Sequence, residues 1–70
     1  MIPLTYAAKG ETSIVRKIGG PAEIRQHLED LGFVVGSAVT VINSMGGNLI
    51  VNIRESRIAI SEEMARRIMV

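Results

Sequence analysis

The chain contains no cysteine, and this absence alone removes several kinds of chemistry. Disulfide bonds, thiolate zinc sites and cysteine nucleophiles are all excluded. His27 is the only histidine, so at most one imidazole is available to activate a hydroxyl nucleophile. The carboxylate pairs Glu29-Asp30 and Glu62-Glu63 are sequence neighbours, which point in different directions on a helix. The sequence therefore predicts a protein that is not an enzyme.

Aromatic residues and long apolar runs are also scarce. Tyr6 and Phe33 are the only aromatic residues, so the core must be aliphatic and few rings are available for stacking nucleic-acid bases. Apolar stretches such as Leu49–Val51 are far shorter than the roughly 20 residues that cross a bilayer. Residues 1–10 have no basic region followed by an apolar run, so they do not resemble a signal peptide. We expect a cytoplasmic protein without direct membrane insertion.

The hydrophobic residues that are present are mostly aliphatic. Hydrophobic residues account for 47% of the 70 residues, which is typical of a folded globular domain and not of a disordered chain. The net charge of +1 is close to balance, and nucleic-acid-binding proteins usually concentrate basic charge. We expect a single domain over residues 1–70 with a marginal core, and no nucleic-acid partner.

The first half of the chain predicts a strand followed by a helix. Residues 1–11 are expected to be an extended lead-in, and the β-branched stretch Thr12–Ile18 a strand. After the break at Gly19-Gly20, a helix is predicted over Pro21–Leu31, because proline suits the first position and apolar residues recur at helical spacing. Gly32 follows and suits a left-handed helix end.

The second half predicts a meander of strands and a short helical turn. Ser44–Gly47 is expected to be a hairpin connection and Arg54–Ser56 a second tight one. Ser61 suits the N-cap of a short helix that begins with Glu62-Glu63. The expected strands are Ser37–Asn43, Asn48–Ile53, Arg57–Ile60 and a final Ile68–Val70.

Side-chain alternation constrains the hairpin. Val39 and Val41 should share a face with Val51 and Ile53, since a one-residue slip would turn one set to solvent. Pairing position 41 with 51 requires an odd loop or a bulge, and Gly46-Gly47 is expected to supply the left-handed residue. Because so short a chain cannot cover a flat sheet, we predict a mainly β fold, a small SH3-like β-barrel with one inserted helix and a short C-terminal helical turn.

Taken in order, these residues resemble the FeoA family of bacterial ferrous iron transport over nearly the whole chain. Most of the matching positions are backbone-geometry glycines or core residues, and the specificity lies in their order and spacing. The matching segments are Pro3-Leu4, Gly10, Arg16–Ile18, the Leu28, Leu31, Gly32, Phe33 and Gly36 signature, Leu49–Val51, Ile58–Ile60, Met64-Ala65 and Ile68–Val70.

The resemblance implies an SH3-like barrel and a regulatory role in ferrous iron uptake. It implies association with the cytosolic GTPase part of a large membrane iron permease, which would recruit the protein to the inner face of the membrane. A similar barrel ends some iron-dependent repressors, but this chain has no helix-turn-helix segment. Oligomeric state is left open, with a homo-oligomer among the alternatives.

An outward-facing apolar patch is the candidate partner surface. The expected register pairs Ile42 with Ile50 on the outer face, with Met45 at the hairpin tip and Arg54 and Arg57 near the rim. An arginine of this turn could also reach a nucleotide in a partner GTPase, although most turn arginines are solvated.

The alternative for the same patch is a structural role. In that interpretation Leu4 and Tyr6 of the lead-in fold over Ile42 and Ile50, because a marginal core gains from any cover.

Glu23, His27 and Asp30 are the candidate metal ligands, since they fall on one flank of the predicted helix. The simpler interpretation is a solvated charged flank, and no intrinsic cofactor is expected. Two other functions remain as alternatives: a small barrel that itself binds Fe²⁺ or another divalent transition metal ion, and a nucleic-acid-binding barrel.

Overall fold

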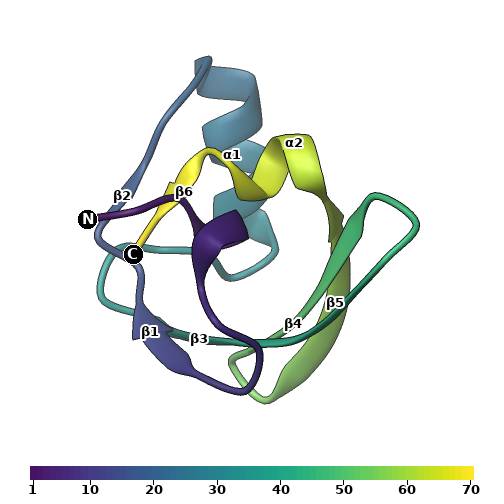
Figure 1. The fold of residues 1–70 in the computed structure, drawn as a ribbon. Coiled ribbons are helices and arrows are strands. Elements are labelled where there is room, and N and C mark those ends of the chain that lie inside the picture. The colour runs from purple at the N-terminus through teal and green to yellow at the C-terminus, as the bar shows by residue number, and fades with distance from the viewer.

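The computed structural model describes all residues 1–70 (Figure 1). Strands dominate, and the one long helix is inserted between two of them, so the predicted mainly β class with an inserted helix is confirmed. In chain order the elements are the 3-10 turn η1 (Leu4–Tyr6), β1 (Thr12–Ile14), β2 (Lys17–Ile18), α1 (Ala22–Asp30), β3 (Ala38–Met45), β4 (Asn48–Ile53), β5 (Ser56–Ser61), α2 (Glu62–Ala65) and β6 (Ile68–Met69).

The strands form two antiparallel sheets that do not join into one closed ring. One sheet has the order β1-β3-β4-β5, and the other consists of β2 and β6. The single strand predicted over Thr12–Ile18 is wrong, because the chain changes sheets in its middle. Val15 is fully buried there; its N–H donates to Ser37 O (2.9 Å), and its carbonyl accepts from Gly36 N (2.8 Å). Arg16 N then donates to Met69 O (2.8 Å), which leads the chain into the second sheet.

The β3–β4 register confirms the predicted inward row. Val39 pairs with Ile53 and Val41 with Val51, and all four side chains are buried. The predicted Ile42–Ile50 pair is wrong: the ladder shifts between Val41 and Asn43, and Asn43 pairs with Ile50.

The bulge therefore lies within β3 and not in the hairpin connection. Met45 still pairs with Asn48, so Gly46-Gly47 alone makes the turn, with φ of 56° and 82°. Two positive φ values are what the tight two-residue turns that follow strand twist require. The second connection is likewise only Arg54-Glu55, both at positive φ.

The lead-in is not extended throughout. Leu4–Tyr6 makes a 3-10 turn, in which Tyr6 N donates to Pro3 O and Ala7 N to Leu4 O, both at 3.0 Å. Before this turn, Ile2 and Val70 exchange two backbone hydrogen bonds of 2.8 Å. The two ends of the chain therefore lie side by side (Figure 1).

The core is almost wholly aliphatic, as the composition predicts. It draws on every part of the chain and contains one aromatic residue. Its twelve members are Leu4, Val15, Leu28, Phe33, Val39, Val41, Leu49, Val51, Ile53, Ile60, Ala65 and Ile68.

α1 begins one residue later than predicted, because Pro21 is extended (ψ 154°) and forms the N-cap, and it ends at Asp30 with Leu31 as the C-cap, whereas α2 begins after Ser61 as predicted. Ser61 Oγ accepts from Met64 N (3.2 Å), which caps α2. At the end of α1, Gly32 N donates to Glu29 O and Phe33 N to Leu28 O, both at 2.9 Å. This is the Schellman arrangement, with Gly32 at φ +108° and the residues that close it, Leu28 and Phe33, both in the core.

Replacing Gly32 by alanine is expected to destabilise the protein, because a Cβ there meets an unfavourable backbone conformation and lies 3.3 Å from Arg54 Cδ. A cost of about 1–2 kcal/mol should lower the melting temperature by roughly 4–8 °C per kcal/mol. Gly19→Ala is the matched control, since its Cβ would have only Arg67 O nearby, at 3.8 Å. Equal melting temperatures for the two variants, measured by circular dichroism, would contradict the assigned role of Gly32.

Candidate functional site

The hairpin patch expected from the sequence is only partly assembled. Met45 is 62% exposed, whereas Ile42 and Ile50 are half-buried. Met45 and Ile50 line one shallow depression of about 350 Å³ together with Ala59. Ile42, the extra residue of the bulge, does not line it.

Arg54 does not lie at the rim of this depression, contrary to expectation. Met45 pairs with Asn48 at one end of β4, while Arg54 follows Ile53 at the other end. The Arg54 side chain instead lies against Gly32, at the C-terminal end of α1. A cation is electrostatically favoured at that end of a helix.

The two lead-in residues proposed to cover the outer face lie elsewhere. Leu4 belongs to the main core and Tyr6 is 76% exposed. Arg57 lies on β5 opposite Asn52 of β4. The prediction that these hairpin residues contact a partner stays a prediction.

The flank of α1 that carries the three candidate ligands is solvated. Glu23, His27 and Asp30 are all exposed, and Gln26 Nε2 donates to Asp30 Oδ1 (3.0 Å). No three His, Cys, Asp or Glu side chains come together in a group that could hold a metal ion. The structure therefore does not assemble Glu23, His27 and Asp30 into a binding site.

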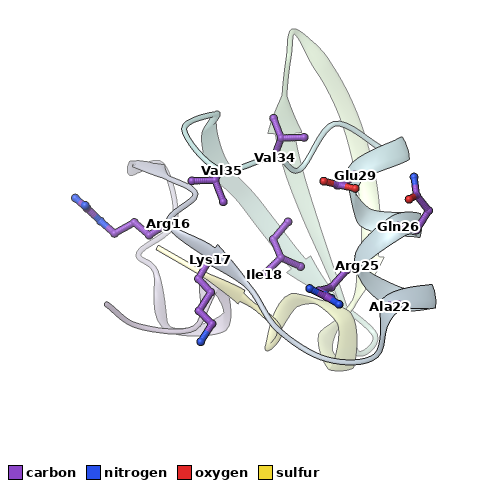
Figure 2. A pocket seen from close by; sticks show the side chains of 9 residues that line it. All are labelled: Arg16, Lys17, Ile18, Ala22, Arg25, Gln26, Glu29, Val34 and Val35. Carbon is purple, nitrogen blue, oxygen red and sulfur yellow. The ribbon is translucent and has the colours of Figure 1, made fainter.

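A groove between β2 and α1 is the largest surface feature, and the sequence did not reveal it. It has a volume of about 530 Å³. Figure 2 shows Ile18 and Arg25 pointing into the space between the strand and the helix, with Val34 and Val35 closing its other side. The lining residues are Arg16, Lys17, Ile18, Ala22, Arg25, Gln26, Glu29, Val34 and Val35.

Charge around the groove is predominantly positive. Arg16, Lys17 and Arg25 line it, against Glu29 as the single acid. Lys17 also lines a neighbouring depression of about 320 Å³, to which Arg66 and Arg67 contribute and no acid does. Five of the eight Lys and Arg residues therefore line these two neighbouring depressions.

Four of the nine residues that line the groove are hydrophobic. Ile18 is half-buried at its base, and Val35 is 68% exposed at its edge. Its residues come from three separate segments, so no local motif could have predicted it. Neither α1 nor α2 has the length and hydrophobicity of a membrane-spanning helix.

The family model for the FeoA domain matches residues 2–70. A protein of Methanocaldococcus jannaschii named "Putative Fe(2+) transport protein A" is 39% identical over the whole chain and 85% of its own length.

Solved structures agree with this match. A crystal structure of an "Iron Uptake Regulatory Protein (FeoA)" is 35% identical with a TM-score of 0.90, covering 99% of this chain and 92% of its own. FeoA of Stenotrophomonas maltophilia, solved with zinc and described as an SH3 domain protein, is 24% identical with a TM-score of 0.86, covering 100% and 89%. The similarity to the Stenotrophomonas structure confirms the SH3-like fold. The chain therefore belongs to the FeoA family, the accessory proteins of ferrous iron transport.

Proposed function

We propose that this chain is a non-enzymatic, cytosolic accessory protein that binds the cytosolic GTPase part of the ferrous iron permease. The observation that carries the proposal is the FeoA-domain match across residues 2–70, joined by a relative whose name assigns it to Fe²⁺ transport. The Stenotrophomonas protein is named as a candidate activating factor of ferrous iron transport, which supports the same role.

The surface of the molecule agrees with a contact role. The groove between β2 and α1 is lined by aliphatic and charged side chains from several elements, and the hairpin depression by uncharged residues that include Met45 and Ile50. In the groove, the exposed Val35 lines the same space as Arg25, and exposed aliphatic side chains beside arginines are typical of protein interfaces.

Binding to the permease can be measured directly. Titrating the chain into the purified cytosolic GTPase domain of its own organism's permease should give saturable heat by isothermal titration calorimetry. The expected affinity is in the micromolar range, because small transient interfaces of this kind bind weakly. A small SH3-like barrel from outside the family serves as the control. Absence of binding at the highest attainable concentrations would refute the proposed function.

The alternative of a metal-responsive barrel also has a clear test. Because Glu23, His27 and Asp30 are exposed and not assembled, micromolar Zn²⁺ or Fe²⁺ should produce no saturable heat and leave the α1 amide signals unchanged. Saturable micromolar binding that disappears in His27→Ala would favour the metal-binding alternative instead.

A further inference from the structure

The groove between β2 and α1 has walls that the backbone holds in place. On one side, Val34 N donates to Gly32 O (3.0 Å) and Gly36 N to Val15 O (2.8 Å), so the loop carrying Val35 is fixed at both ends. On the other side, α1 ends in its glycine-closed turn. A ligand therefore meets a largely formed groove and loses little free energy in ordering it.

One edge of β2 carries no strand. β2 pairs with β6 alone, and the groove lies between β2 and α1 (Figure 2). A strand with an unpaired edge is a common docking place for an extended segment of another chain. The volume of about 530 Å³ is in the range of ligand sites and fits a few side chains.

The charges select the chemistry of that segment. Arg25 points into the groove beside Ile18, whereas the side chains of Arg16 and Lys17 extend from the strand away from α1 (Figure 2). A carboxylate in the groove would pair with the Arg25 guanidinium, with Arg16 and Lys17 adding positive charge at the edge, and Glu29 is the only lining acid that opposes this. The apolar side chains of Ile18 and Val35 call for an aliphatic partner next to those carboxylates.

We propose that this groove binds an extended, acidic segment of a partner protein that presents an aliphatic side chain beside its carboxylates. The proposal rests on the proposed function in taking the cytosolic part of the permease as the natural source of that segment, and it deepens that function by naming the surface and its ligand.

One competing surface and one competing ligand fit the structure less well. The hairpin depression is lined by Met45, Gly46, Asn48, Ile50 and Ala59, so it offers no charge with which to select a partner. Nucleic acid would find cations in the groove but no aromatic side chain among its lining residues on which bases could stack.

A model peptide tests the groove without the permease. An octapeptide of alternating Leu and Glu should shift the amide signals of residues 16–18, 22–29 and 34–35 in the isotopically labelled full chain. The matched Leu-Lys octapeptide should leave them unchanged. Shifts elsewhere on the molecule, or equal shifts with both peptides, would overturn the proposal.

Four exposed positions provide matched variants. Arg25→Glu and Val35→Ser should each weaken binding of the Leu-Glu peptide and of the permease domain about tenfold. Lys9→Glu and Tyr6→Ser make comparable changes away from both the groove and the hairpin, and they should leave both affinities unchanged. All four side chains are exposed, so melting temperatures should stay near that of the wild type.

The outcomes distinguish a failure of the groove proposal from a failure of the proposed function. If the affinity for the permease domain is unchanged in Arg25→Glu and Val35→Ser, the groove proposal is refuted and the proposed function stands. If permease binding is lost in a Met45→Ser variant instead, the contact lies on the hairpin. If the permease domain does not bind at all, the proposed function fails, and the peptide titration still decides on the groove. A short oligonucleotide that shifts the groove signals more strongly than the acidic peptide would overturn the proposal in favour of nucleic-acid binding.

Discussion

Val15 is the point at which the chain leaves one sheet and enters the other. Its side chain is fully buried, and its backbone groups bond to Gly36 and Ser37, not to a regular strand partner. Because β1 pairs with β3 and β2 pairs with β6, the two sheets meet at this residue and enclose the core between them. A marginal core of aliphatic side chains depends on this crossing, since neither sheet alone could be covered in so short a chain.

The same crossing creates the surface on which the protein can act. By turning β2 away from the larger sheet, it leaves one edge of β2 without a strand beside α1. Gly36, which bonds to Val15, also fixes the loop that carries Val35. Fold and candidate site are therefore two consequences of one arrangement.

Features encoded within one short segment could be predicted from the sequence. The helix with Gly32 after it, the inward row of Val39 and Val41, and the Ser61 cap each depend on neighbours close along the chain or on simple alternation. The FeoA resemblance, carried by spacing over the whole chain, gave the fold and the family.

Features that depend on contacts between segments far apart in the sequence could not be predicted. Thr12–Ile18 contains no glycine or proline that would mark a break, and only the change of partner at Val15 divides it. Alternation required one irregularity in the hairpin but could not tell a longer loop from the bulge at Ile42. The groove joins residues of β2, α1 and the loop after α1, which have no shared signal along the sequence.

The backbone hydrogen bonds between Ile2 and Val70 hold residues from the two ends of the chain next to each other. With its two ends hydrogen-bonded side by side, the chain returns to its starting point. A short linker would therefore be enough to join the ends, and the unit could be placed within a loop of a larger host protein without pulling either sheet apart. Joining the ends costs little chain entropy, because the fold has already brought them together. In evolutionary terms, such a domain is as suited to insertion and fusion as to a separate existence.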